Sequence, residues 1–457
     1  MEAFSQFIAD VDGFLWNNIL LFVLVGVGIF FTIRTKFVQI RRFRPAWKRV
    51  FSGFTLKGEA AGKHGMSSFQ ALATAIAAQV GTGNIAGCST ALVSGGPGAI
   101  FWMWLAAFFG MATIYAEAYM AQKTKTKNED GEVIGGPVYY IKAAFNNGFG
   151  KVLAIIFAIL AVFALGFMGC MVQTNSISDA FNDAFSVPKL VTGIILAVIA
   201  GFIFIGGLRR IASFTEKIVP IMAAIYLLGG LIVLIINIKN VPWAIGSIFV
   251  GAFSPKAVGG AVIGITVRAA MRFGVARGLF SNEAGMGSTP HAHALADVKD
   301  PSEQGEVAMI GVFVDTFIVL TMTALVVLSS GVLDGMITSG TTGTPVAQAA
   351  FSGALGVIGS PFVAICLLFF AFSTVIGWYF FAEQNVKYLW GKKAIIPFAI
   401  LMMGFMVLGA VLKVGVVWDL QDLFDGLLVL PNLLALVFLS GIVAKSAKSK
   451  KENKMLQ

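Results

Sequence analysis

Two glycine-rich stretches lie inside otherwise apolar sequence, at residues 67–96 and 259–288. Each contains a central pair of glycines: Gly81 and Gly83 in the first, and Gly274 and Gly278 in the second. A glycine in a helix interior is about 1 kcal/mol less favourable than alanine, so these pairs predict breaks in two helices. A broken helix offers amide groups to an anion and free carbonyls to a cation. The alternative is that the small residues let two helices pack closely.

An ionisable residue within a predicted membrane segment is a candidate functional group, and we single out three such residues. Arg268 and Arg272 are four residues apart and therefore share one helix face, while Asp315 lies in the middle of a later apolar segment. An isolated charge at the centre of a bilayer costs about 2.5–3.5 kcal/mol. We therefore expect Asp315 to neutralise one of the two arginines.

The residue patterns of enzymes and metal proteins do not occur in the sequence. It has no HExxH helix and no GxSxG turn, and the serines and threonines near the glycine pairs have no neighbouring histidine. His291 and His293 are two residues apart and so do not share a helix face, whereas zinc needs three or four converging ligands. The three cysteines fall singly inside apolar segments. We expect no catalytic residue and no cofactor.

The composition predicts an all-α integral membrane protein. Of the 457 residues, 57% are hydrophobic and 12% are charged, whereas soluble domains carry about 25% charged residues. Unbroken apolar runs such as 20–31 and 153–169 exclude the alternating pattern of a membrane β-barrel. Since a span needs about 20 residues, we expect about eleven transmembrane helices, near residues 14–33, 66–94, 97–121, 152–174, 190–208, 216–237, 258–286, 304–331, 359–386, 394–413 and 424–444.

The net charge of +10 is concentrated in loops between the expected spans. Basic clusters lie at residues 34–49, 123–127, 209–210, 392–393 and 445–454. Alternating eleven helices places all of them on one side, which the positive-inside rule assigns to the cytoplasm. This pattern excludes a nucleic-acid binder and predicts a multi-pass protein of the cell membrane, with the N-terminus outside and the C-terminus cytoplasmic. An acidic first segment (Glu2, Asp10, Asp12) predicts a retained first helix and not a signal peptide.

The positions of the two glycine-rich spans predict an inverted repeat. If the first helix is an extra one, they become the first helix of each five-helix half, and they cross the membrane in opposite directions. The expected organisation is an extra N-terminal helix with a basic loop (1–50), a first repeat (51–240), a second repeat (241–445) and a basic cytoplasmic tail (446–457).

Four stretches resemble one known family. GGPGAIFWMWLAAFFG (95–110) resembles the signature of the alanine or glycine:cation symporter family, and so do AAQVGTGNIAG (77–87), RFGVARGLFSNEAGMGS (272–288) and AFSTVIGWYFFAEQ (371–384). The resemblance covers nearly the whole chain. It implies a leucine-transporter-type fold with an added N-terminal helix, and sodium as the coupling ion.

The resemblance also implies where the coupling ion binds. Residues 80–84 resemble the V-G-x-G-N segment in the first broken helix of related sodium-coupled transporters. By that match, the carbonyls of Ala77 and Val80 and the hydroxyls of Ser373 and Thr374 would hold sodium. Oxygen-only ligation suits such a hard cation.

The implied substrate site lies between the two breaks. The substrate carboxylate would meet the amides of Gly81, Thr82, Gly83 and Asn84, with the side chains of Gln79 and Asn84 as donors. The second break, expected at residues 273–277, would offer the substrate ammonium the carbonyls of Phe273, Gly274, Val275 and Ala276. Phe167 and Trp378 are the expected apolar walls.

These expectations together describe a sodium symporter of small neutral amino acids that works by alternating access. Its expected partners are L-alanine, glycine, D-alanine as a further candidate, sodium and the lipid bilayer, with no nucleic acid and no obligate protein partner. A proton-coupled symporter is the alternative, but the four expected ion ligands offer only neutral oxygens, which favours sodium. A channel or an intramembrane enzyme is a remoter alternative.

Overall fold

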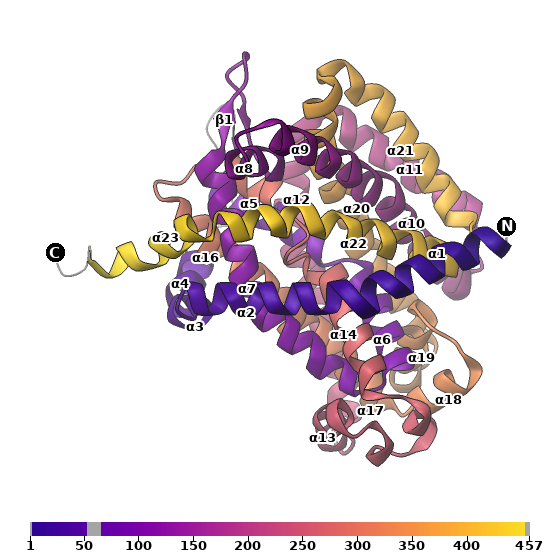
Figure 1. The fold of residues 1–457 in the computed structure, drawn as a ribbon. Helices are drawn as coiled ribbons and strands as arrows, with labels where there is room; N and C mark the ends of the chain where they lie inside the picture. Colours follow the sequence, from indigo (N-terminus) through magenta and orange to yellow (C-terminus); the bar gives the residue numbers. More distant parts are fainter. Residues whose placement is uncertain (1, 53–64, 453–457) are drawn as a thin grey trace.

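The computed structural model describes residues 2–52 and 65–452, which form a bundle of helices (Figure 1). One long helix lies across the face shown: α1 (Glu2–Leu15), the π-helical segment η1 (Trp16–Leu20) and α2 (Leu21–Arg34). Two short helices follow, α3 (Val38–Arg41) and α4 (Phe43–Ser52). We call the end of the bundle near the start of α1 the N-terminal side, and the end near α4 the C-terminal side (right and left in Figure 1).

The next part of the chain begins with an interrupted helix. Ser67 caps α5 by accepting a hydrogen bond from the amide of Gln70, whose side chain bonds back to Ser67. The elements in order are α5 (Ser68–Gln79), η2 (Gly83–Gly87), α6 (Cys88–Gly95), α7 (Gly98–Thr124), β1 (Thr126–Lys127), β2 (Val133–Ile134), α8 (Pro137–Ala144), α9 (Gly148–Ala161), η3 (Val162–Gly169), α10 (Cys170–Phe185), α11 (Lys189–Ile205) and α12 (Gly207–Ile236). The two strands pair as a small antiparallel hairpin.

The remaining elements include a second interrupted helix. Thr266 caps its first part, α14, by accepting from the amide of Ala269. The elements are α13 (Val241–Phe253), η4 (Pro255–Ala257), η5 (Gly260–Gly264), α14 (Val267–Asn282), α15 (Pro290–Leu295), α16 (Pro301–Val312), η6 (Phe313–Leu320), α17 (Thr321–Ser330), α18 (Leu333–Ser339), α19 (Thr344–Leu355), η7 (Gly356–Ile358), α20 (Gly359–Trp390), η8 (Lys392–Ala394), α21 (Ile395–Val411), α22 (Val414–Phe438) and α23 (Ser440–Glu452).

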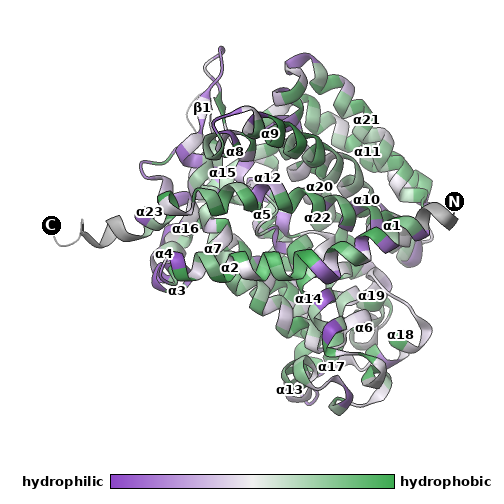
Figure 2. Cartoon of the chain, in the orientation of Figure 1, coloured by the Kyte–Doolittle hydropathy of each residue, from purple (hydrophilic) through white to green (hydrophobic). Residues whose placement is uncertain are grey.

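The helices have the apolar exterior of a membrane protein. Eight of those described are long and apolar enough to cross a bilayer. Large apolar side chains on α11 and α12 face outward, including Phe202, Ile205 and Leu228, which are 66%, 84% and 62% exposed. Hydrophobic residues dominate the outer helices in Figure 2, whereas hydrophilic colours gather at loops and at a few interior positions. Because water would penalise such a surface, the all-α membrane class is confirmed.

The expected spans agree with the helices in number but differ at some ends. Each of the eleven overlaps a described helix or interrupted helix, although the last, α22, begins at Val414 and not near residue 424. Seven of the described α-helices lie outside the expected spans: α3, α4, α8, α13, α15, α18 and α19. They are short connecting helices of 4–13 residues, too short to give a spanning signal. The proposed domain boundaries stay a prediction, and residues 453–457 of the expected tail lie outside the described residues.

Ion pairs join several of the basic loops on the C-terminal side. Lys392 pairs with Asp130 and with Glu132 of the β1–β2 hairpin, and these contacts raise the pKa of the lysine above its usual value. On the same side, Arg49 of α4 lies 3.2 Å from Glu303 of α16. Loops far apart in the sequence therefore gather at one end of the bundle. Which end is cytoplasmic stays a prediction.

Candidate functional site

The first break lies where the sequence predicts it. α5 ends at Gln79 because Val80 adopts an extended backbone, and the helix resumes only at Gly83. The side chain of Asn84 turns back to accept from the amide of Gly81 at 2.9 Å. Thr82 donates to Oε1 of Gln173 through its amide at 3.1 Å and its hydroxyl at 2.6 Å. Side chains thus replace the missing helical hydrogen bonds.

Three of the four expected sodium ligands, those of Ala77, Ser373 and Thr374, meet on one side of this break. The hydroxyl of Thr374 donates to the carbonyl of Ala77 at 2.9 Å, and that of Ser373 lies 3.4 Å from the same oxygen. Both hydroxyls also bond to the carbonyl of Phe370 one turn earlier. Neutral oxygens from α5 and α20 therefore converge, and this donor set suits a hard monovalent cation.

The second break lies further along the chain than expected. α14 is continuous from Val267 to Asn282, so the carbonyls of residues 273–276 belong to helical turns and are not free for a ligand. The prediction of a break at 273–277 is therefore wrong. The turn follows at Glu283, which has a left-handed backbone (φ 59°), and continues through Gly285 and Gly287, with φ of 99° and 82°. The motif SNEAGMGS, and not the glycine pair before it, marks the break.

Gly274 and Gly278 lie in a closely packed helix instead. A Cβ on Gly274 would lie 2.5 Å from the carbonyl oxygen of Ala99 and 2.8 Å from the Cβ of Trp102, both on α7. A Cβ on Gly278 would make only ordinary contacts with Met103, at 3.7 Å. The small residue at position 274 serves close helix packing, the alternative interpretation of this glycine pair.

The two breaks lie against each other. A Cβ on Gly83 would lie 2.9 Å from Cα of Ser281. Gln79 donates its side-chain amide to the carbonyl of Asn282 at 2.7 Å. The end of α5 and the end of α14 thus meet at the centre of one buried cluster.

Asp315 joins this cluster and does not pair with an arginine. Its carboxylate accepts from Nδ2 of Asn84 at 2.7 Å, from the hydroxyl of Ser281 at 3.0 Å and from that of Thr316 at 2.9 Å. Arg272 instead lies 3.4 Å from Asp12 on the N-terminal helix, and Arg268 is exposed. No ion pair of the described residues includes Asp315, so the expected pairing with one of these arginines is wrong. The π-helical segments η2 and η6 hold Asn84 and Asp315, and such segments often occur at functional sites.

Two further carboxylates, Glu283 and Glu117, hold the second break. Trp378 donates its indole N–H to Glu283 at 2.6 Å. Glu117 on α7 accepts from Asn432 at 2.6 Å and from the amide of Gly285 at 3.3 Å. Sequence reasoning missed Glu117, Gln173 and Asn432, since each lies in an ordinary helical segment.

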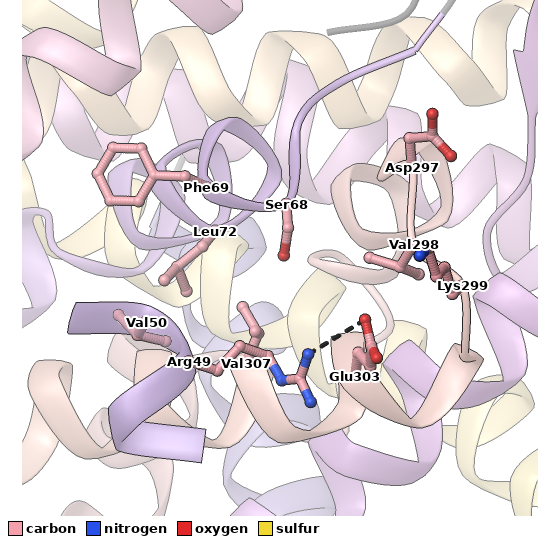
Figure 3. Close-up of a pocket in the computed structure, with 10 residues that line it drawn as sticks. All are labelled: Arg49, Val50, Ser68, Phe69, Leu72, Asp297, Val298, Lys299, Glu303 and Val307. Atoms are coloured by element: carbon pink, nitrogen blue, oxygen red, sulfur yellow. Dashed lines mark ion pairs between the residues drawn. The ribbon is translucent and has the colours of Figure 1, made fainter. Parts of the chain in front are cut away.

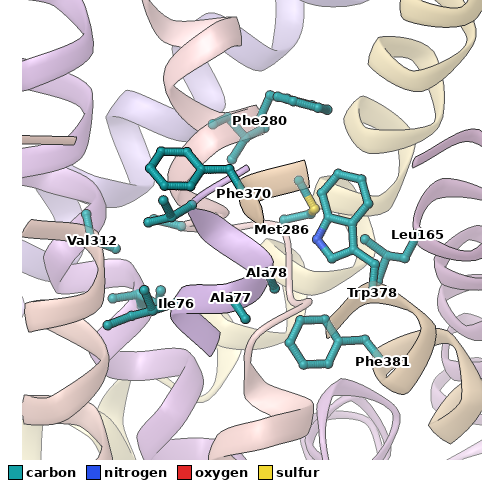
Figure 4. Packing of buried hydrophobic residues seen from close by; sticks show 14 of the residues in the cluster. Ile76, Ala77, Ala78, Leu165, Phe280, Met286, Val312, Phe370, Trp378 and Phe381 are labelled. Atoms are coloured by element: carbon teal, nitrogen blue, oxygen red, sulfur yellow. The ribbon is translucent and has the colours of Figure 1, made fainter. Parts of the chain in front are cut away.

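Aromatic rings surround the breaks (Figure 4). Phe280 packs edge-on against Trp378, with 5.7 Å between ring centroids, and lies 4.7 Å from the ring of Trp418. Trp378 is thus near the site, as expected. Phe167 is not, because it stacks on Phe405 of α21 with 4.6 Å between centroids. The neighbouring part of η3 reaches Trp378 through Gly169, where any Cβ would collide with the indole ring.

The N-terminal side of the cluster is closed by a buried ion pair. Arg277 binds both carboxylate oxygens of Asp422 through two nitrogens, at 2.7 and 2.6 Å. Its guanidinium also lies over the ring of Trp418, 4.5 Å from the centroid. Arg277 and Asp422 are each 7% exposed. We call this pair the latch, since it joins α14 to α22 about one helical turn before Phe280.

The C-terminal side contains two adjoining cavities. The larger, of about 410 Å³, lies between α4, α5 and α16 and includes the pair formed by Arg49 and Glu303 (Figure 3). The smaller, of about 140 Å³, has an apolar lining and reaches Val80. Val50, Phe69 and Leu72 line both. Among the described residues, the break is therefore closed toward the N-terminal side and hollowed toward the C-terminal side.

Comparison with known proteins agrees with this architecture. The profile of the sodium:alanine symporter family matches residues 1–456. The chain is 43% identical over 450 residues to the sodium/alanine symporter AgcS of Methanococcus maripaludis, covering 98% of this chain and 97% of that protein. It is 40% identical over 453 residues to the amino-acid carrier protein AlsT of Bacillus subtilis, covering 98% and 92%.

A solved structure supports the fold. The crystal structure of MhsT in complex with L-phenylalanine aligns with a TM-score of 0.60 at 15% identity, covering 84% of this chain and 99% of that one. At that identity the likeness concerns the fold alone, and it agrees with the expected leucine-transporter type. The residue motifs, the architecture and the relatives all indicate the same family. The chain therefore belongs to the sodium:alanine symporter family and is a multi-pass secondary transporter, not an enzyme.

Proposed function

We propose that this transporter carries a small neutral amino acid, such as alanine or glycine, together with sodium by alternating access. The observation that carries the proposal is the contact between the two helix breaks, next to the oxygen cluster of Ala77, Ser373 and Thr374. Amides at one break and carbonyls at the other suit a zwitterion. The neutral oxygens beside them suit a coupling cation.

The substrate carboxylate is proposed to bind at the first break, against the amides of residues 81–84. The ammonium is proposed to bind at the carbonyls of Phe280 and Ser281, in place of those at 273–276. The amides that would continue α14 are used elsewhere: that of Ala284 bonds to the side chain of Asn282, and that of Gly285 bonds to Glu117. The carbonyls at the end of α14 are thereby left for a ligand.

The aromatic rings near the two breaks support a preference for a small substrate. Phe280 lies between Trp378 and Trp418, and Trp378 is fixed by its hydrogen bond to Glu283. Rigid rings that leave room for a methyl group and little more would exclude longer side chains. We therefore place alanine and glycine, with either alanine stereoisomer, ahead of larger amino acids.

The sodium gradient supplies enough free energy for accumulation. One sodium ion moving down 100 mV releases about 2.3 kcal/mol, and a tenfold concentration gradient adds about 1.4 kcal/mol. With one sodium per substrate, the sum supports accumulation of roughly a few hundredfold.

The test is binding of radiolabelled L-alanine to purified protein, with sodium exchanged for potassium or choline. We expect tight binding only in sodium, and competition by unlabelled glycine and D-alanine but not by phenylalanine. Equal binding in all three salts would remove the sodium coupling. Failure of any small neutral amino acid to bind would remove the substrate class.

A proton-coupled symporter is the second candidate, and Asp315 favours it. The carboxylate is completely buried, its bonded partners Asn84, Ser281 and Thr316 are neutral, and no ion pair of the described residues includes it. A charged carboxylate within a membrane needs compensation by a cation or by its own proton. Uptake driven by a pH gradient without sodium, lost in Asp315→Asn but kept in the exposed control Asp183→Asn, would favour protons.

A further inference from the structure

The N-terminal helix contacts both helices that carry the latch. On α14, Arg272 lies one and a half turns before Arg277, and its Nη2 is 3.4 Å from Oδ2 of Asp12. On α22, the backbone carbonyl of Asp422 accepts a hydrogen bond from the indole nitrogen of Trp16 at 3.3 Å. Two residues one turn apart on the N-terminal helix therefore contact the two helices that carry the ion pair of Arg277 and Asp422.

Close packing fixes this helix to α22. A Cβ on Gly426 would lie 2.5 Å from Cδ1 of Leu20 and 2.8 Å from Cδ2 of Leu15. The absence of a side chain at Gly426 lets the N-terminal helix approach the backbone of α22, one turn beyond Asp422. Movement of α22 would therefore disturb these contacts.

Asp12 and Trp16 of the N-terminal helix are buried, although the helix lies at the outside of the bundle. Asp12 is 5% exposed and Trp16 is 2% exposed. Asp12 Oδ1 has no hydrogen-bond partner among the described residues. Asp419 and Asp422 are close enough to interact with Asp12 electrostatically, as are Arg272 and Arg277. A carboxylate placed among these charges is sensitive to any separation of α14 from α22.

We propose that residues 6–20 act as a strap that stabilises the closed latch, with Asp12 positioning α14 and Trp16 positioning α22. The inference rests on the proposed alternating access, in which Arg277 and Asp422 separate when the N-terminal side opens. Opening moves the two helices apart, and the strap cannot follow both. Either the Asp12–Arg272 contact or the Trp16–Asp422 hydrogen bond must then break, so both are positioning contacts for the transport cycle.

The test measures the separation of α14 and α22 directly. Spin labels are attached to Arg268→Cys and Gly415→Cys, positions that are exposed at the starts of these helices, in full-length protein in lipid vesicles. The native cysteines are all buried. Pulsed electron paramagnetic resonance then gives the ratio of long to short distances with neither sodium nor alanine present.

The variants separate the strap from the latch. Asp12→Asn removes the charge that faces Arg272, and Trp16→Phe removes only the indole donor while keeping an aromatic ring. Each is expected to raise the open-to-closed ratio about fivefold, the lower range of typical coupling between sites. The matched control is Asp10→Asn, the same change at an exposed position of the same helix, where the carboxylate accepts a hydrogen bond from Gln6 at 2.9 Å. It is expected to leave the ratio unchanged.

Exchange of the charges provides a second check. The double variant Asp12→Arg with Arg272→Asp is expected to restore the distance distribution lost in Asp12→Asn. Arg277→Gln serves as the reference, because it breaks the latch itself. If Arg277→Gln does not open this side, the latch and the proposed cycle are wrong. If Arg277→Gln opens it while Asp12→Asn and Trp16→Phe do not, the latch stands and the strap is wrong.

Discussion

Asn84 donates its side-chain amide to the carboxylate of Asp315, with 2.7 Å between Nδ2 and Oδ1, while Oδ1 of Asn84 accepts from the amide of Gly81. One side chain thus ties the first helix break to a buried acid on η6. Ser281 at the end of α14 bonds to the same carboxylate. Asp315 is therefore the point at which the two interrupted helices and η6 are joined, and any ligand that binds at the breaks acts on this joint.

Asn84→Ala is expected to abolish detectable alanine binding. The substitution removes the acceptor for the amide of Gly81 and the donor of the shortest hydrogen bond to Asp315. A buried polar group that loses its hydrogen-bond partner costs about 1–3 kcal/mol. Radiolabelled alanine binding in saturating sodium measures the effect. The control, Asn182→Ala, removes an exposed asparagine that bonds to the carbonyl of Val187 and is expected to bind normally. Normal binding by Asn84→Ala would move the substrate away from the first break.

Thr374→Val is expected to raise the sodium concentration needed for half-maximal alanine binding by tenfold or more. The substitution keeps the shape of the side chain but removes the hydroxyl that lies 2.9 Å from the carbonyl of Ala77. Loss of one contact between a neutral oxygen and a charged ion costs about 1.5–3 kcal/mol, as for a hydrogen bond to a charged group. Thr374→Ser retains the hydroxyl and is expected to keep the sodium dependence of the unaltered protein. An unchanged sodium requirement in Thr374→Val would place the ion elsewhere.

Sequence reasoning predicted those parts of the fold that leave a local signal. The first break was placed correctly because Gly81 and Gly83 interrupt a long apolar helix, and the candidate sodium ligands on α20 followed from a family motif. The second break was misplaced because Gly274 resembles Gly81 in sequence, whereas its role is set by α7, far away in the chain. No local sequence pattern distinguishes a glycine that packs against a neighbouring helix from a glycine that ends the helix to which it belongs.

Charge partners were the least predictable feature. Asp315 and Arg272 are both buried or half-buried ionisable groups, and the sequence offers no means to see that each has a nearer partner on another helix. Asp12 is the partner of Arg272, but it lies in the N-terminal segment, where an acidic residue indicated only that the first helix is retained. Tertiary packing alone reveals such pairs, since it joins residues 260 positions apart.

Gly274→Ala is expected to destabilise the protein by about 1–3 kcal/mol without changing its affinity for sodium. The added methyl group would lie 2.5 Å from the carbonyl oxygen of Ala99, which forces α14 and α7 apart. Gly278→Ala, one turn later, is the matched control because its methyl group makes ordinary contacts at 3.7 Å. Thermal unfolding and sodium titration of both variants measure the difference. Equal stability of the two would contradict the packing role of Gly274.

The latch is expected to behave as a functional pair and not as a simple brace. Asp422→Asn removes one partner of a buried, bidentate ion pair, a change that typically destabilises by about 3–5 kcal/mol. The double variant Arg277→Met with Asp422→Leu removes both charges and is expected to recover most of that stability. Its sodium-driven accumulation of alanine should nevertheless remain low, because the N-terminal side no longer closes against the gradient.

The matched comparison for the latch is the ion pair of Lys189 and Asp179, whose side chains are 42% and 24% exposed. Removing that pair is expected to change stability by no more than about 1 kcal/mol and to leave accumulation intact, since solvent already screens it. Thermal unfolding followed by intrinsic fluorescence and alanine uptake into vesicles are measured on the same preparations. Full accumulation by the Arg277→Met and Asp422→Leu double variant would reduce the pair to a structural brace, whereas a stable protein that cannot accumulate alanine identifies Arg277 and Asp422 as the closure of the transport site.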